Sequence, residues 1–125
     1  TMSRFITRST GTAVLTSVIF GGNCDFSGVT TFANAFQGNS LLATIQFDSG
    51  VSFAACTSFS NAFQNCPLDT LLYDALLDRI DATNVNNSVT LTANLANYTL
   101  GGAAEASRTQ LTSVQLWTIT DAGGV

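Results

Sequence analysis

The side chains available for chemistry are few, and their types exclude several kinds of site. The chain of 125 residues has no His and no Lys, but has four Arg, seven Asp, one Glu and three Cys. Without His it lacks a histidine acid–base pair, a catalytic triad and a histidine-ligated zinc site. Without Lys it lacks a Schiff base and a P-loop lysine. Four Arg and a net charge of −4 oppose a nucleic-acid footprint, so we expect no nucleic-acid partner.

Carboxylates are the remaining acid–base groups, because a pair of them suffices for glycoside hydrolysis. Asp74 and Asp78 are four residues apart on a predicted helix, where a solvated outer face explains them. Asp25 and Asp48 lie at turn positions 23 residues apart, which is out of register with the 27-residue repeat described below. An enzyme would need two carboxylates that converge in a cleft. We therefore expect no catalytic residue.

The sequence also offers oxygen and sulfur atoms that could bind a metal. A polar loop contains Asp81, Asn84, Asn86 and Asn87, but it lacks the Gly and terminal Glu of a calcium loop. The three cysteines have no CxxC spacing and no His partner, and we expect three buried free thiols. They are Cys24, Cys56 and Cys66. The sequence predicts no metal site and no cofactor.

A repeat of 27 residues organises the first half of the chain. Residues 17–41 align without gaps on residues 44–68, with nine identities. Polar positions repeat together with apolar ones, which makes the signal strong. The identical pairs are Phe20/Phe47, Phe26/Phe53, Thr30/Thr57, Phe32/Phe59, Asn34/Asn61, Ala35/Ala62, Phe36/Phe63, Gln37/Gln64 and Leu41/Leu68.

Each repeat is predicted to contain a short strand, a turn and a short helix. Residues 17–20 and 44–47 alternate in the manner of strands. The next apolar residues recur at the spacing i, i+3, i+7 that is typical of the inner side of two helical turns. These residues are Val29, Phe32 and Phe36 in the first repeat and Cys56, Phe59 and Phe63 in the second. Gly38 and Asn65 lie where such helices would end.

This period is the size of a leucine-rich repeat, and it sets the predicted fold class. We expect an α/β repeat, namely a short leucine-rich-repeat-like solenoid of strand–short helix units with an α+β C-terminal cap. The matching Phe rings of the two repeats should lie side by side, and Asn34 should stack on Asn61 in a ladder.

The second half of the chain is predicted to be the cap, because a stack of two repeats cannot bury its own end. Its clearest element is an amphipathic helix over 67–81, with Asn65 or Cys66 as N-cap. We also expect strands over 89–92 and 115–120 and a short helix over 103–112. The domain organisation is one domain, 1–125, with a leader or junction at 1–14, two repeats at 15–66 and the cap at 67–125.

The two units, with the shared pattern F-x-N-A-F-Q-[GN]-[NC]-x-L, resemble BspA-like leucine-rich repeats. Cys66 occupies the usual Cys position of that family, whereas Asn39 departs from it. The tail resembles the segment that follows such repeats in bacteriophage and bacterial surface proteins, and the resemblance covers residues 15–124. It implies a binding or adhesion module outside the cell or on a virion tail fibre, without catalytic residues.

The sequence therefore favours a non-catalytic extracellular recognition module, an adhesin or fibre tip that binds a host or prey surface ligand. The ligand would be a cell-surface glycan or protein, and the location a bacterial cell surface or a virion fibre. The expected contact residues point away from the apolar side of the two strands: Ser17, Ile19, Thr44 and Gln46. The alternative is a structural module for oligomerisation or capping in a fibre, with a homotrimer formed through a fibre shaft. No segment has the 18 apolar residues of a membrane helix, so membrane insertion is not expected.

Overall fold

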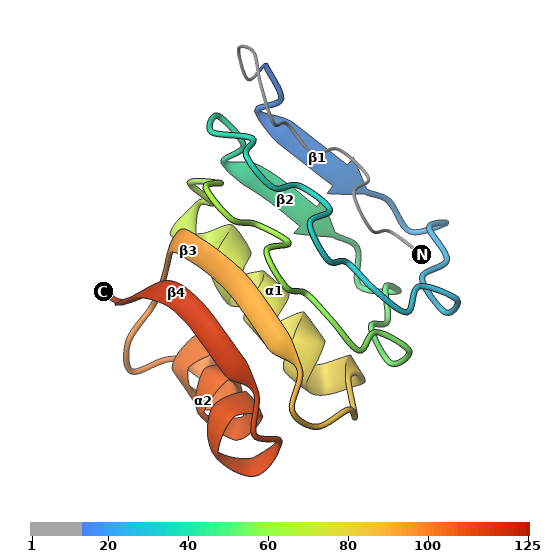
Figure 1. Ribbon diagram of the computed structural model, residues 1–125, viewed down its shortest axis with the longest axis vertical. Coiled ribbons are helices and arrows are strands. Elements are labelled where there is room, and N and C mark those ends of the chain that lie inside the picture. Colours follow the sequence, from blue (N-terminus) through green and yellow to red (C-terminus); the bar gives the residue numbers. More distant parts are fainter. Residues whose placement is uncertain (1–13) are drawn as a thin grey trace.

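The computed structural model describes residues 14–125, and its elements are shown in Figure 1. The predicted leader at 1–14 lies outside the described residues except for Val14. In chain order the elements are β1 (Ser17–Phe20), β2 (Thr44–Phe47), α1 (Thr70–Thr83), β3 (Thr90–Tyr98), α2 (Ala103–Thr109), the π-helical turn η1 (Gln110–Val114) and β4 (Thr118–Gly124).

The elements form two layers around one core. In the first layer β1 pairs with β2, α1 packs beside β2, and α2 packs against α1. In the second layer the segments 30–38 and 57–65 are followed by β3 and β4, and the helices lie behind β3 and β4 in Figure 1. Side chains from both layers meet between them and make a continuous apolar core.

Parallel backbone pairing joins the segments of the second layer. The Phe32 N–H donates to the Ser58 carbonyl at 2.8 Å, and the Phe59 N–H donates to the Thr90 carbonyl at 2.9 Å. β3 then pairs with β4 in parallel. In the first layer, β1 pairs with β2 in the register Ser17 to Thr44, which is the 27-residue offset of the sequence repeat.

Stacked phenylalanine rings fill the core between the two layers. The expected side-by-side pairs are confirmed, because the Phe32 and Phe59 rings stack with centroids 5.5 Å apart and the Phe36 and Phe63 rings stack at 5.8 Å. Phe26 meets Phe53 edge to face at 6.1 Å. At the end of the row Trp117 lies 5.9 Å from Phe59, so an indole from the second half covers the last ring.

The predicted fold class was wrong. The described residues form two two-stranded parallel sheets and two α-helices, and not a solenoid of strand–short helix units. The segments 29–36 and 56–63, predicted as short helices, consist of turns and extended stretches.

The physical cause is the backbone conformation of two asparagines. Asn34 has φ 58° and Asn61 has φ 54°, a left-handed conformation that Asn tolerates and that ends a right-handed helix. The N–H of Ala35 bonds to the Phe32 carbonyl and closes a turn around Asn34. Gly38, with φ 80°, lies at a further turn and not at a helix end. The spacing i, i+3, i+7 therefore came from successive turns.

The predicted asparagine ladder is confirmed at this position. The Asn61 side-chain amide donates to the Asn34 side-chain oxygen at 3.3 Å. A second pair forms between the Gln37 amide and the Gln64 side-chain oxygen at 2.7 Å. These pairs hold the two turns together in the same register as β1 and β2.

The other predicted elements are confirmed in type, with shifted bounds. The strands at 17–20 and 44–47 are confirmed. β3 extends beyond the predicted 89–92 to Tyr98, and β4 begins at Thr118 and ends at Gly124, where 115–120 was predicted. The predicted N-cap, Asn65 or Cys66, was wrong, because Asp69 caps α1 by accepting the Leu71 N–H at 3.0 Å. The predicted helix at 103–112 forms as α2 and continues into η1.

The stacked core predicts a large penalty for removing a central ring. Replacing Phe59, which is fully buried, with Ala should lower the free energy of unfolding by about 3–5 kcal/mol, since it leaves a cavity between Phe32 and Trp117. Urea denaturation measures this change. Leu71→Ala, at a side chain that is 73 % exposed, is the control and should change stability by less than about 0.5 kcal/mol. Equal effects of the two substitutions would contradict the role given to the stack.

The left-handed conformation of Asn61 predicts that Gly at this position destabilises the chain less than Ala does. Asn61→Gly keeps the backbone conformation and loses only the ladder hydrogen bond, whereas Asn61→Ala also strains the backbone. We expect the Ala variant to be less stable than the Gly variant by about 1–2 kcal/mol in thermal or urea denaturation. A more stable Ala variant would mean that the turn has another conformation.

Candidate functional site

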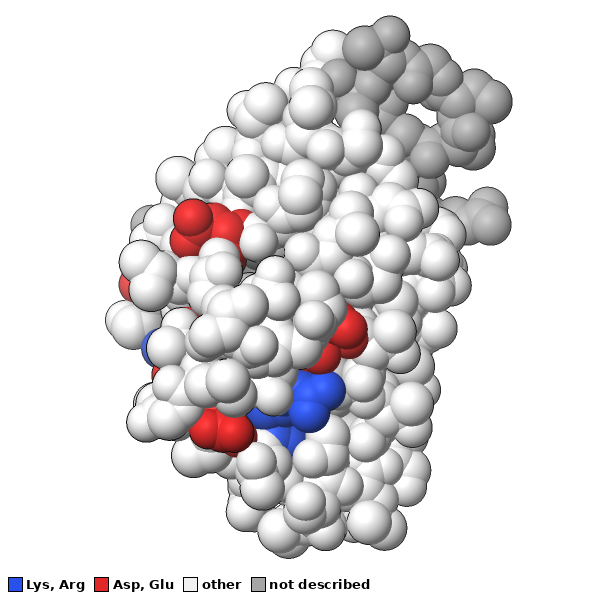
Figure 2. All heavy atoms as spheres, turned by 90° about the vertical axis from the view of Figure 1, so that its left-hand side faces the viewer, with Lys and Arg blue, Asp and Glu red and all other residues white. Residues whose placement is uncertain are grey.

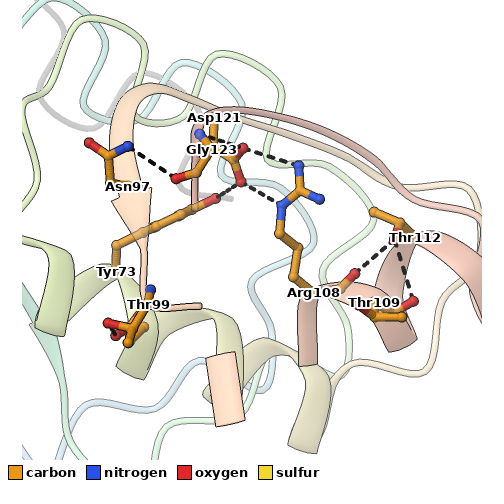
Figure 3. Close-up of polar contacts among 9 residues, drawn as sticks. Tyr73, Asn97, Thr99, Arg108, Thr109, Thr112, Asp121 and Gly123 are labelled. Carbon is orange, nitrogen blue, oxygen red and sulfur yellow. Dashed lines mark hydrogen bonds and ion pairs between the residues drawn. The ribbon is translucent and has the colours of Figure 1, made fainter. Parts of the chain in front are cut away.

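The main charged cluster of the described residues surrounds the carboxylate of Asp121 (Figure 3). The Arg108 Nε donates to Asp121 Oδ2 at 2.8 Å, and Arg108 Nη2 donates to Oδ1 at 3.1 Å. The Tyr73 hydroxyl donates to Oδ2 at 3.1 Å. The carboxylate therefore accepts a bidentate guanidinium contact and a phenol hydrogen bond, with only 2 % of its side chain exposed.

Three elements of the C-terminal half bring these side chains together. Tyr73 comes from α1, Arg108 from α2 and Asp121 from β4, where it lies on the inward side two residues after Ile119. The guanidinium carbon of Arg108 also lies 5.0 Å from the centre of the Tyr98 ring. The cluster thus ties both helices to the last strand.

The surroundings raise the pKa values of Tyr73 and Arg108. Burial raises the pKa of Tyr73, and the neighbouring Asp121 carboxylate raises it further, so the phenol stays neutral and donates its proton. The hydrogen bond to Asp121 raises the pKa of Arg108, although burial opposes it. The Gly123 N–H also donates to Asp121 Oδ1, at 3.3 Å, so the carboxylate accepts four hydrogen bonds. A carboxylate that is buried and already accepts four hydrogen bonds is not exposed to act as a base or nucleophile. The arrangement serves to hold the packed elements in place.

Sequence reasoning missed this cluster. Arg108 and Asp121 are 13 residues apart, and Tyr73 is 48 residues from Asp121, so no local pattern connects them. One signal was present, since the alternation of the last strand places Asp121 on the same inward side as Ile119. A charge on the apolar side of a strand predicts a buried partner.

The structure brings the four expected contact residues together on one surface. Ser17 lies beside Thr44 and Ile19 beside Gln46 in the parallel register of β1 and β2. Ser17, Ile19 and Gln46 are exposed and Thr44 is half-buried, while Ile45 on the opposite side of the strand is buried. We call these four residues the strand face. Its composition is one aliphatic, one amide and two hydroxyl side chains.

The candidate carboxylate pairs each bind a nearby polar group. Asp74 accepts the Thr99 hydroxyl at 2.6 Å and the Thr99 N–H at 2.9 Å. Asp78 accepts the Ser107 hydroxyl at 2.8 Å. Each carboxylate therefore joins α1 to the segment around α2. Asp25 accepts the Ser27 N–H, and this hydrogen bond lowers the pKa of Asp25.

The polar loop that could have offered oxygens to calcium uses its amides as donors. The Asn84 amide donates to the carbonyls of Phe53 and Cys56, each at 2.8 Å. The Asn86 amide donates to the carbonyls of Ala54 and Cys56, each at 3.0 Å. The loop thus supports the turn at 53–56. Within residues 14–125, no group of three or more His, Cys, Asp or Glu side chains is placed to hold a metal ion.

The cysteines are free thiols in two different surroundings. Cys56 and Cys66 are buried, but the expected burial of Cys24 was wrong, because this residue ends an exposed turn closed by its N–H on the Gly21 carbonyl. The Cys66 thiol lies 3.1 Å from the Phe36 carbonyl, and burial raises its pKa to about 11. A thiol in that state is a packing group and not a nucleophile.

No protein-family model, curated protein or solved structure matches this chain. None of the helices in residues 14–125 has the length and apolar character needed to cross a bilayer. The function is therefore inferred from the geometry and composition of the surface.

The charged cluster predicts a large loss of stability when Asp121 is replaced by Asn, a side chain of the same shape without the charge. Asp121→Asn leaves the Arg108 guanidinium without a counter-charge, and should lower the free energy of unfolding by about 3 kcal/mol. Asp74→Asn, at a more exposed carboxylate that also joins two elements, should cost about 1 kcal/mol. Urea denaturation at neutral pH compares the two. A smaller loss for Asp121→Asn than for Asp74→Asn would contradict the role of the cluster.

The thiols predict a labelling pattern and an alkaline limit of stability. A thiol reagent should label one cysteine, Cys24, in the folded chain and three after unfolding. Folding raises the pKa of Cys66 from 9.0 to about 11, so its contribution to stability is complete below pH 9 and is lost as pH rises through about 11. Labelling counts and denaturation between pH 7 and pH 11 measure both effects. Rapid labelling of all three thiols in the folded chain would contradict the structure.

Proposed function

We propose that this chain is a non-catalytic extracellular recognition module, an adhesin or fibre tip of a bacterial surface or virion. It binds a surface ligand of a host or prey cell, either a glycan or a protein. The observation that supports this proposal is the strand face, where Ser17, Ile19, Thr44 and Gln46 stand in register. The resemblance to BspA-like repeats in surface proteins points to the same class.

The strand face is suited to binding because its support is rigid. Directly behind it, the Phe20 and Phe47 rings stack at 5.0 Å, and Ile45 is buried. Backbone pairing between β1 and β2 fixes the relative positions of the outward side chains. A preorganised surface loses little conformational entropy when a ligand binds.

The charge distribution also fits recognition by short-range contacts. Between residues 14 and 66 the ionisable Asp and Arg side chains are only Asp25 and Asp48. Figure 2, which shows the side of the molecule on the left of Figure 1, has a mostly uncharged surface with a few small acidic patches and a basic patch next to acidic ones. Such a surface gives weak electrostatic steering and suits direct hydrogen bonds to neutral groups.

The proposed function predicts that negative charge on the strand face prevents binding. The double variant Thr44→Glu with Gln46→Glu should weaken binding to a glycan array or to target cells at least tenfold, because it adds two desolvated charges to a neutral contact. The matched control is Thr109→Glu with Gln110→Glu, an exposed Thr–Gln pair on the helical side. Circular dichroism and thermal denaturation verify that both variants fold. Unchanged binding by the strand-face variant would remove this face as the contact surface.

A further inference from the structure

Small hydroxyl side chains cover the outer side of the second layer. One apolar side chain from each of its four segments points into the core: Phe32, Phe59, Leu91 and Ile119. The residues on either side of each therefore point outward. These eight residues are half-buried or exposed, and seven of them carry a hydroxyl group: Thr31, Ser58, Ser60, Thr90, Thr92, Thr118 and Thr120, with Ala33 as the eighth. We call the seven the hydroxyl face, and the helices lie on the opposite side of this layer (Figure 1).

Backbone pairing aligns these residues in two rows across the four segments. The Phe32 N–H donates to the Ser58 carbonyl, and Phe59 forms a parallel bridge with Leu91. β3 and β4 then continue the same register. The first row contains Thr31, Ser58, Thr90 and Thr118, and the second contains Ala33, Ser60, Thr92 and Thr120. Neighbours within a row are about 4.8 Å apart, and the two rows are separated by about 6.6 Å.

The first two segments of this layer run side by side almost without twist. Their two stacked ring pairs have interplanar angles of 9° and 7°. Neighbouring strands of an ordinary sheet are rotated by about 20–25°, and flat sheets are usually held by stacking or by side-chain ladders. Both devices occur here, and the Asn94 amide, which donates to the Asn65 side-chain oxygen at 3.2 Å, extends the ladders to β3. The rows therefore repeat in two dimensions on a flat support.

The hydroxyl face is uncharged, and its side chains have little freedom. Asp121 is the only charged residue of the four segments, and its carboxylate points inward to Arg108. Thr is stiff about χ1 because its Cβ is branched. The hydroxyls of Thr31 and Ser58 each accept the N–H two residues further on, at 3.0 and 3.3 Å, and keep their own protons to donate. A preorganised face of this kind loses little conformational entropy on binding.

A partner that contacts every position of this face must itself repeat in two dimensions. The spacing within a row is close to a lattice repeat of hexagonal ice, in which each water molecule donates and accepts hydrogen bonds as a hydroxyl group does. A crystalline polysaccharide is also regular, but its sugar rings pack on exposed aromatic side chains. The Phe rings of these segments are fully buried, and Tyr98 at the end of β3 packs beside Arg108. The chemistry of the face therefore favours ice over a polysaccharide.

We propose that the hydroxyl face binds ice. The Thr and Ser hydroxyls hold water molecules in the positions of lattice waters, and the Thr methyl groups pack between those waters. The inference goes beyond the proposed recognition function, because the hydroxyl face belongs to the second layer and the strand face to the first.

Adsorption to growing ice tests the proposal directly. Ice is grown slowly in a dilute solution of the full chain, and the protein in the ice and in the liquid is quantified. The ice should contain at least tenfold more of this chain than of a globular protein of similar size that has no affinity for ice. Exclusion of the chain from the ice to the same degree as that protein would overturn the proposal. Adsorption to powdered cellulose or chitin without adsorption to ice would also overturn it.

Variants of the chain place the binding on the hydroxyl face. Thr118→Lys with Thr120→Lys puts two long charged side chains at exposed positions of both rows, and should lower the adsorbed fraction at least tenfold. The matched control, Thr109→Lys with Gln110→Lys, adds the same charge on the helical side and should leave adsorption unchanged. Thr90→Lys repeats the test on β3, and circular dichroism verifies that each variant folds. Equal adsorption by the two double variants would overturn the proposal.

The two proposals fail in different ways. The strand-face variant, Thr44→Glu with Gln46→Glu, should adsorb to ice as well as the unchanged chain, because it alters only the first layer. Loss of adsorption in this variant would overturn the assignment of ice to the hydroxyl face. A chain that binds cells or glycans through the strand face and is excluded from ice retains the proposed function and overturns the ice inference.

Discussion

The structure depends on one constraint, which is the registration of aromatic rings across segments 27 residues apart. Phe20 on Phe47, Phe32 on Phe59 and Phe36 on Phe63 stack with nearly parallel planes, and this is possible only if the backbones that carry them keep the same offset. The β1–β2 pairing and the side-chain ladders use that offset too. Burial of the rings supplies the main stabilising free energy, while the hydrogen bonds allow only one register. The position of the strand face follows from this core.

Much of this arrangement could be predicted, because identical residues at a fixed offset in the sequence lie side by side in the fold. The offset between identical Phe and Asn residues predicted which side chains would touch, and alternation predicted β1 and β2 with their outward residues. The conformation between the strands was predicted wrongly, because an apolar residue every third or fourth position suits successive turns as well as a helix. The distinguishing signal was Asn34 and Asn61 themselves, since Asn adopts the left-handed conformation more readily than most residues.

The second half of the chain shows a different limit of sequence reasoning. The amphipathic pattern predicted α1, but the N-cap depended on where the chain turned after Pro67, and the competing candidates Asn65 and Asp69 are both good capping residues. The cluster of Tyr73, Arg108 and Asp121 joins three elements whose mutual placement is decided by packing. A side-chain cluster between separate helices and strands can be identified only when their packing is known.

The inward carboxylate of Asp121 has a consequence for the solubility of the chain. β4 pairs with β3 along one edge, and no further strand of the described sheet pairs with its other edge. An unpaired strand edge can bind a strand of another chain, which is how aggregation begins. A shift of β4 by one residue would turn Asp121 outward and separate it from Arg108, which makes the native alignment strongly preferred over slipped ones. Native edge strands use inward-pointing charges to discourage edge-to-edge addition of other chains. The ion pair between Arg108 and Asp121 therefore also disfavours the addition of another chain to this edge.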